Sequence, residues 1–238
     1  MKLDILAFAA HPDDVELACS GTLLKHILAG KKAGVVDLTR GELGTRGTAA
    51  IRQEEADRAT ELLGLSSRDN LGFADGFFVD DRAHQLEVVK KIRQYQPEII
   101  LANAPMDRHP DHGRASALLT TACFLSGLLK IETLVDGQVQ PPWHPKAIYH
   151  YIQDRYIQPD FIVDISAVFE QKLKIIKTFS SQFYNPDSKE PVTAISTPEF
   201  MEFLVARAQH FGRDAGVKYA EGFKVERVVA VNNLFDLI

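Results

Sequence analysis

Apolar and polar positions alternate in two distinct ways along the first 130 residues of the chain. Short continuous apolar runs, such as LDILAFAA at 3–10, are typical of strands that are buried on both faces. Between these runs, apolar residues recur every three or four positions, which is the spacing of one helix face. The pattern predicts strands at 3–10, 33–39, 70–76 and 98–104, and helices at 14–29, 48–63, 84–95 and 113–129.

The regular order of strand and helix predicts the fold class. Strands that are joined through helices form a parallel sheet, and the helices cover both of its faces. We therefore expect a Rossmann-like α/β fold with a mostly parallel sheet, in a single domain over residues 1–238.

The pattern is less regular after residue 130. It predicts strands at 147–152, 161–165 and 226–231, and helices at 167–179 and 198–213. The polar segment at 184–198, which contains prolines, is expected to be a mobile loop and is a candidate lid.

Two titratable motifs follow predicted strands. His11-Pro12-Asp13-Asp14 comes after the first strand, and Arg-His-Pro-Asp-His at 108–112 comes after the strand at 98–104. Ligands of open parallel sheets bind beyond the carboxyl ends of the strands, so the two motifs should converge. His11 and Asp14, joined by His109 or His112, would form a set of two histidines and one carboxylate. Three protein ligands with an open position are typical of a catalytic zinc site.

Composition and charge exclude several classes of protein. The net charge of −5 and the pI near 5.9 argue against nucleic-acid binding, which requires a basic surface. No apolar run reaches the roughly 20 residues of a membrane span, and the N-terminus is expected to be a strand, not a signal peptide. Cys19 and Cys123 both lie in predicted helices, which favours buried free thiols and a cytoplasmic protein.

The motifs resemble those of the LmbE/PIG-L family of metal-dependent N-deacetylases. The resemblance rests on AHPDDVE at 10–16, RHPDH at 108–112, DLTRGELGTRGTAAIRQEEA at 37–56 and YAEGF at 219–223. Length and the TRGELGTRGT segment are most similar to the branch that deacetylates N-acetylglucosaminyl malate in bacillithiol biosynthesis. The resemblance implies the LmbE/PIG-L type of fold, Zn²⁺ with Fe²⁺ as an alternative in the cell, a small aminosugar conjugate as substrate, and a homo-oligomer.

The same resemblance implies roles for the motif residues. It makes His11, Asp14 and His112 the metal ligands. Asp13 becomes the general base that takes a proton from the attacking water. His109 is expected to stabilise the oxyanion as an imidazolium, held in that form by a hydrogen bond to Asp111.

Three arginines are expected to bind the substrate. The resemblance assigns a sugar contact to Arg52, and the arginine fork suits the two carboxylates of malate. Arg46 and Arg108 are the candidates for that second contact. The mobile tyrosine that the family places near the oxyanion has no assured counterpart, and the candidate positions are Phe200 and Tyr184.

Two other functions compete with hydrolysis. Two histidines and one carboxylate also bind iron in non-haem oxygenases, but that chemistry has no role for a second carboxylate such as Asp13. A nucleotide-binding or metal-storage module on the same fold would carry a glycine fingerprint after the first strand. The chain has Ala-Ala-His-Pro-Asp-Asp at that position.

Overall fold

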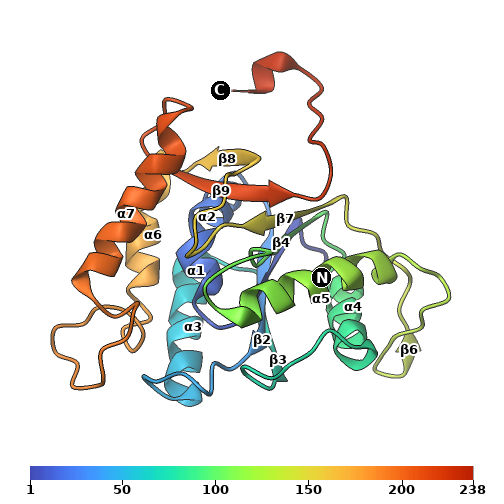
Figure 1. Ribbon diagram of the computed structural model, residues 1–238. Coiled ribbons are helices and arrows are strands. Elements are labelled where there is room, and N and C mark those ends of the chain that lie inside the picture. Colours follow the sequence, from blue (N-terminus) through green and yellow to red (C-terminus); the bar gives the residue numbers. More distant parts are fainter. Residues whose placement is uncertain (238) are drawn as a thin grey trace.

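The computed structural model describes residues 1–237 and contains a seven-stranded sheet (Figure 1). Its strands lie in the order β3-β2-β1-β4-β7-β9-β8. The strands β1, β2, β3, β4 and β7 are parallel, and β9 runs antiparallel to both β7 and β8. The bounds are β1 Ile5–Ala9, β2 Ala33–Thr39, β3 Ser67–Phe73, β4 Ile99–Ala102, β7 Ala147–Tyr151, β8 Phe161–Asp164 and β9 Ala220–Val225. The prediction of a mostly parallel sheet is confirmed.

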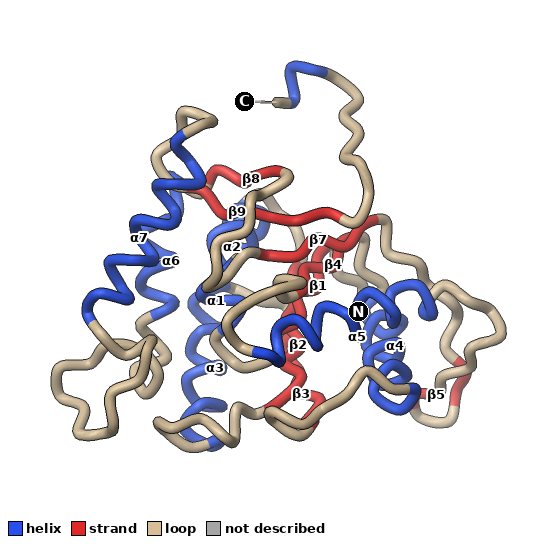
Figure 2. Tube along the Cα trace, in the orientation of Figure 1, coloured by secondary structure: helices blue, strands red, loops and turns tan. Residues whose placement is uncertain are grey.

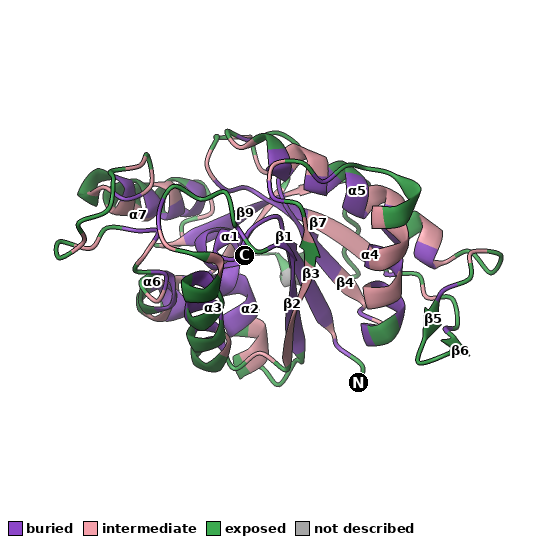
Figure 3. Ribbon diagram, turned by 90° about the horizontal axis from the view of Figure 1, so that it is seen from below, coloured by how far each residue is buried: buried purple, intermediate pink, exposed green. Residues whose placement is uncertain are grey.

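Helices cover the sheet on both faces, as the view along the layers shows (Figure 3). One face carries α4 (Arg82–Tyr95) and α5 (Pro110–Ser126), which pack an apolar cluster against β1, β2 and β4. The opposite side carries α1 Asp14–Ala18, α2 Ser20–Leu28, α3 Ala49–Leu63, α6 Phe169–Ile176 and α7 Pro198–Arg213. The small hairpin of β5 (Leu134–Val135) and β6 (Gln138–Val139) lies apart from the sheet, and the 3₁₀ turns η1 (Ser166–Val168) and η2 (Leu234–Asp236) complete the structure.

Local sequence explains where several helices begin. The hydroxyl of Thr48 accepts a hydrogen bond from the Ile51 amide and caps α3, and the hydroxyl of Thr197 caps α7 in the same way. The helix α5 begins at Pro110, three residues before the predicted start, because Pro suits the first helical position and the His109 side chain accepts from the Asp111 amide. This early start places Asp111 and His112 in the first turn of the helix.

The predicted helix at 14–29 is two helices separated at Cys19. The cause lies in tertiary structure, since the Glu221 carboxylate of β9 accepts hydrogen bonds from the Gly21 and Thr22 amides. A side chain from a distant strand thus satisfies the amides at the start of α2. Glu221 is buried, as are the free thiols of Cys19 and Cys123, which agrees with the expectation for the cysteines.

The predicted strand at 226–231 is wrong. The last strand of the sheet is β9 at Ala220–Val225, which the sequence pattern did not indicate, and the chain leaves the sheet after Val225 (Figure 2). Residues 220–223 are buried because β9 is inserted between β7 and β8, whereas Val228 is 87% exposed. No helix within residues 1–237 is long and apolar enough to cross a membrane.

Candidate metal and active site

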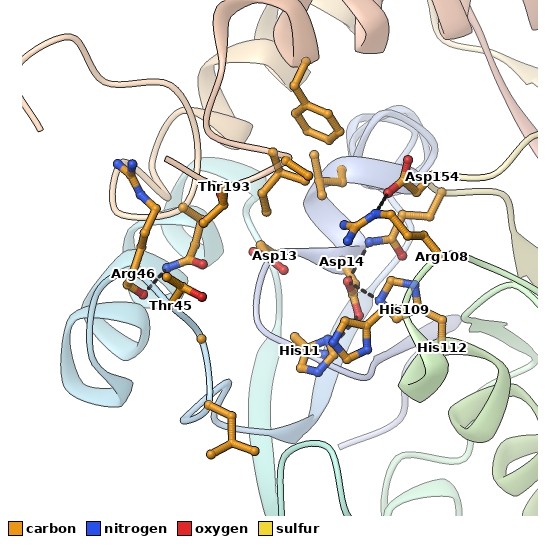
Figure 4. A pocket seen from close by; sticks show the side chains of 18 of the residues that line it. His11, Asp13, Asp14, Thr45, Arg46, Arg108, His109, His112, Asp154 and Thr193 are labelled. Atoms are coloured by element: carbon orange, nitrogen blue, oxygen red, sulfur yellow. Dashed lines mark hydrogen bonds and ion pairs between the residues drawn. The ribbon is translucent and has the colours of Figure 1, made fainter. Parts of the chain in front are cut away.

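The loops that follow β1 and β4 converge at one end of the sheet. They line a pocket of about 310 Å³ together with residues from the loops after β2, β3 and β7 and from α7. The rings of His11, His109 and His112 gather beside Asp14 at the base of this pocket (Figure 4). The expected convergence of the two motifs is therefore present.

The rings of His11 and His112 are oriented by buried carboxylates. The Nε2 atom of His11 lies 3.0 Å from Asp75 Oδ1, and the Nδ1 atom of His112 lies 2.7 Å from Asp107 Oδ2. The second nitrogen of each ring faces Asp14, with His112 Nε2 3.2 Å from Oδ1 and His11 Nδ1 3.7 Å from Oδ2. A histidine whose outer nitrogen binds a carboxylate, and whose other nitrogen points to a shared centre, is typical of metal-binding histidines.

Asp14 is held in place by neutral donors as well. Its Oδ2 atom accepts from the Asn103 side-chain amide at 3.0 Å and from the His11 backbone amide at 2.9 Å. Its Oδ1 atom accepts from the Gln153 amide at 2.6 Å. Burial opposes ionisation, but the positive charge of His112 and the hydrogen bonds of His11 and His112 hold the pKa of Asp14 well below its ordinary value. Asp14 is therefore an ionised, fixed carboxylate.

His112 and Asp14 are spaced like two ligands of a divalent ion of zinc type. Two ligand atoms about 2.0–2.1 Å from a tetrahedral ion are separated by about 3.3 Å, close to the 3.2 Å between His112 Nε2 and Asp14 Oδ1. Ligand nitrogens of His11, His109 and His112 also lie within 4.8 Å of one another, as do the donor atoms of His11, Asp75 and Asp111. The pocket thus holds more than one group of three potential ligands.

Asp13 lies next to Asp14 in a conformation that side chains rarely adopt. Its φ of 130° is far from the region that residues other than glycine favour, so the turn holds this residue under strain. The Asp13 Oδ2 atom lies 3.0 Å from Arg52 Nη2. Burial raises the pKa of Asp13 to about 7, against the lowering effect of the Arg52 charge. A carboxylate with this pKa can accept a proton near neutral pH.

The structure changes the expected relation between His109 and Asp111. The Asp111 carboxylate accepts from the Gly76 amide and Arg114, and it lies 3.4 Å from His11 Nε2. It therefore faces His11 and not the His109 ring. Burial, together with the charges of His11 and His112, lowers the pKa of His109, which disfavours the expected imidazolium. The Asp111 backbone amide donates to His109 Nδ1, so a neutral ring carries its proton on Nε2.

The three arginines expected to bind substrate have protein partners. Arg52 donates from Nη2 to the Pro12 carbonyl at 2.6 Å and from Nη1 to the Gly41 carbonyl. A Cβ atom at Gly41, whose φ is 64°, would lie 1.8 Å from Arg52 Nη1, so glycine is required there. Arg108 is exposed and forms an ion pair with Asp154 (Figure 4).

Arg46 lies on the side of the pocket opposite the histidines and binds the segment before α7 (Figure 4). It donates to the Ser181 carbonyl at 2.7 Å, the Ser188 hydroxyl at 2.9 Å and the Pro191 carbonyl at 3.1 Å. Its guanidinium is therefore engaged in fastening part of the predicted loop at 184–198. Thr193, Ala194 and Ile195 of this loop line the pocket.

The two candidates for the tyrosine position differ in location. Phe200 lines the pocket and is nearly buried, with its ring stacked near Phe183. Tyr184 is 46% exposed and is not among the residues that line the pocket. A phenyl ring without a hydroxyl thus occupies this part of the wall.

Sequence reasoning missed several residues of the site. Asn103 and Asp107 belong to the same strand end as the second histidine motif, and Asp75 and Gln153 follow β3 and β7. Extending the search for polar residues to every parallel strand end would have found all four. Arg207 of α7, which also lines the pocket, carried no signal in the sequence.

Comparisons with known proteins agree with the family resemblance. Residues 6–123 match the PIG-L family, described as GlcNAc-PI de-N-acetylase. The diacetylchitobiose deacetylase of Thermococcus kodakarensis is 31% identical over 92% of this chain and 82% of its own length. A probable N-acetyl-alpha-D-glucosaminyl L-malate deacetylase 2 of Bacillus anthracis is 24% identical over 75% of this chain and 81% of its own.

Among solved structures, a conserved protein of Thermus thermophilus superimposes with a TM-score of 0.84. The two sequences are 36% identical, and the match covers 97% of this chain and 98% of the other. Sequence identity and fold therefore agree over nearly the whole chain. The chain belongs to the PIG-L (LmbE) family of deacetylases, which are hydrolases of amide bonds.

Proposed function

We propose that this protein is a zinc-dependent hydrolase that removes the acetyl group from an N-acetylglucosamine unit joined to a second group. The observation that carries the proposal is the orientation of His11 and His112. Each ring gives its outer nitrogen to a carboxylate and turns the other nitrogen toward Asp14. His11, Asp14 and His112 would hold the ion, because both of these histidines have a carboxylate on the nitrogen that faces away from Asp14. His109 is the less suitable ligand, since its Nδ1 atom accepts from a backbone amide. Fe²⁺ is the alternative metal.

The ion, when bound, supplies Lewis acidity that polarises a carbonyl and lowers the pKa of water. Asp13 takes the proton of the water that attacks the acetyl carbonyl, and it returns a proton to the departing amine. Neutral His109 donates its Nε2 proton in a hydrogen bond to the oxyanion. Asp111 acts on the site through His11 and the Gly76 amide. Oxygenase chemistry has no role for Asp13 or for its strained backbone conformation. Membership of a deacetylase family also favours hydrolysis.

Two kinds of second group call for a direct comparison. The relative from Thermococcus kodakarensis, which matches over the larger part of the chain, supports a neutral second sugar. The relative from Bacillus anthracis supports malate, which carries two carboxylates. N-acetylglucosaminyl malate stays a candidate because Arg207 of the pocket has no carboxylate partner among the side chains that the structure describes.

Acetate release from N,N′-diacetylchitobiose, N-acetylglucosaminyl malate and free N-acetylglucosamine tests the proposal. The zinc-loaded protein should cleave a conjugate faster than the free sugar. Asp13→Asn should keep its metal and lose roughly 10²–10⁴-fold in kcat, because the base is removed and the ligands remain. Asp80→Asn, an exposed change, is the matched control. Absence of deacetylation by the zinc-loaded and iron-loaded wild-type protein would refute the proposal.

A further inference from the structure

The charges that line the pocket are almost completely paired. Arg52 lies against Asp13, and Arg108 lies against Asp154. Arg46 is held by three oxygen acceptors and lies 3.9 Å from Glu190. The carboxylates of Asp14 and Asp75 face the histidines.

Arg207 is the exception among the four arginines of the pocket. Among the side chains that the structure describes, those of residues 1–235 and 237, no carboxylate lies within 4.0 Å of its guanidinium, and the hydrogen bond that it makes there runs from Nη2 to the Leu17 carbonyl at 2.8 Å. The Phe203 ring lies 5.6 Å from the guanidinium carbon and offers no anion. Burial lowers the pKa of Arg207 to about 10, and Glu221, Asp154 and Asp107 oppose this shift only from a distance.

A cation in this position has a clear use. The Arg207 side chain is half-buried. Shielding a charge from water without a counter-ion is costly, and the cost is recovered when an anion enters the pocket and pairs with it. Arginine offers a planar fork that matches both oxygens of a carboxylate. The Leu17 carbonyl lies at the last turn of α1, the helix that carries Asp14, and it also accepts from Lys172. Arg207 is thus anchored through one nitrogen and keeps its remaining donors for a ligand in the pocket.

We propose that Arg207 binds a carboxylate on the group joined to the aminosugar and thereby determines the preference for an anionic over a neutral conjugate. This inference rests on the proposed deacetylation and names a residue for its specificity. Arg46 and Arg108, the arginines expected to bind the anion, have protein partners for their guanidinium groups. Arg207 of α7 takes this role in their place.

The test compares the two conjugates in one set of variants. The ratio of kcat/KM for N-acetylglucosaminyl malate to that for N,N′-diacetylchitobiose is measured for the wild type, Arg207→Met, Arg207→Lys and the control Arg213→Met. Arg213 is exposed at the end of the same helix and does not line the pocket. Arg207→Met should lower the ratio roughly 30-fold, chiefly by raising KM for the malate conjugate, because hydrogen bonds between charged groups are lost. Arg207→Lys should restore part of it.

Other outcomes overturn the inference. An equal loss on both conjugates, accompanied by a lower kcat, would mean that Arg207 only supports α1 through Leu17. An unchanged ratio, or a wild type that cleaves only the neutral conjugate, would mean that no carboxylate binds there.

Calorimetric binding separates this inference from the proposed function. If the wild type cleaves neither conjugate, the proposed function fails, and binding of N-acetylglucosaminyl malate to the zinc-loaded protein still tests Arg207. Binding that is lost in Arg207→Met and kept in Arg213→Met supports the inference. Absence of binding to the wild type, or equal binding to both variants, refutes it.

Discussion

At the scale of single residues, the proposed metal ligands are oriented by hydrogen bonds to neighbouring carboxylates. His112 faces Asp14 because Asp107 accepts its Nδ1 proton, and Asp107 itself accepts from the backbone amides of Arg108 and Arg155. Burial opposes charge on the ring, yet Asp14 and Asp107 raise the pKa of His112 to about 9. The carboxylate thus controls both the orientation and the basicity of a proposed ligand.

Asp107→Asn is expected to weaken metal binding. The substitution preserves the size of the side chain but removes the charge that polarises His112, and loss of such a partner typically costs about 10–100-fold in metal affinity. Competitive titration with a chelating dye measures the effect, and Asp136→Asn, in an exposed turn, provides the comparison. Equal zinc affinity in the two variants would contradict a ligand role for His112.

Arg52→Met is expected to change the pH dependence of deacetylation. Asp13 must be ionised to accept a proton, so activity rises with pH through the pKa of this carboxyl. The Arg52 charge lowers that pKa, and its removal should shift the acidic limb of kcat/KM to higher pH by about one unit. The control is Arg58→Met, an exposed change on the same helix, with metal content verified in both proteins. A limb that stays in place would show that Asp13 is not the base.

At the scale of elements, the segment between α6 and α7 is fastened to the N-terminal half of the chain (Figure 2). Glu55 of α3 accepts from the Ser181 amide and hydroxyl, and the Glu190 carboxylate accepts from the Gly47 amide. Arg46 adds three hydrogen bonds to the same segment. These contacts join the glycine-containing loop after β2 to the segment between α6 and α7, in which Thr193 lines the pocket.

Arg46→Met should release this segment. Each lost hydrogen bond contributes roughly 0.5–1.5 kcal/mol, and bonds to a charged donor contribute more, so local opening should become more frequent. Limited proteolysis with cleavage sites identified by mass spectrometry should show faster cutting within 184–192 than in the wild type. Arg58→Met should be cut at the wild-type rate. If Arg46→Met is cut within 184–192 at the wild-type rate, Glu55 and the apolar contacts are sufficient to hold the segment in place.

At the scale of the whole molecule, one buried ion pair joins elements that are far apart in the sequence. Lys172 of α6 lies 2.5 Å from Glu221 of β9, and the two side chains are 4% and 3% exposed. Lys172 also donates to the Leu17 carbonyl of α1, and Glu221 accepts from the first amides of α2. The pair therefore connects the last strand of the sheet with the helix that carries Asp14.

Lys172→Met should lower the free energy of unfolding by about 3–5 kcal/mol, because it leaves the Glu221 charge buried without its partner. Urea denaturation measures the change, and Lys174→Met, a substitution at a less buried position of the same helix, is the control. The double variant Lys172→Met/Glu221→Gln should recover part of the loss, since it removes the unpaired charge. A loss below about 1 kcal/mol in the single variant would contradict this account.

Local sequence determined the regular part of the protein. The apolar runs that became β1, β2 and β4, and the helix at 198–213, agree with the structure because burial on both faces and helical spacing leave a direct record in the sequence. The two histidine motifs also showed which residues would meet, since parallel strands end at one edge of the sheet. The single domain and the residue roles stay predictions.

Tertiary structure alone decided the contacts between distant segments. The break between α1 and α2 at Cys19 depends on Glu221 of β9. The position of β9 inside the sheet depends on its neighbours β7 and β8. The carboxylates that face His11 Nε2 are those of Asp75 and Asp111. Nothing in the sequence distinguishes Arg46, Arg108 and Arg207 from one another. Only the fold shows that Arg46 and Arg108 have protein partners, whereas Arg207 has no carboxylate partner among the described side chains. Periodicity records which face of an element is buried, whereas the partner of a charged side chain is set by residues that the fold brings from elsewhere in the chain.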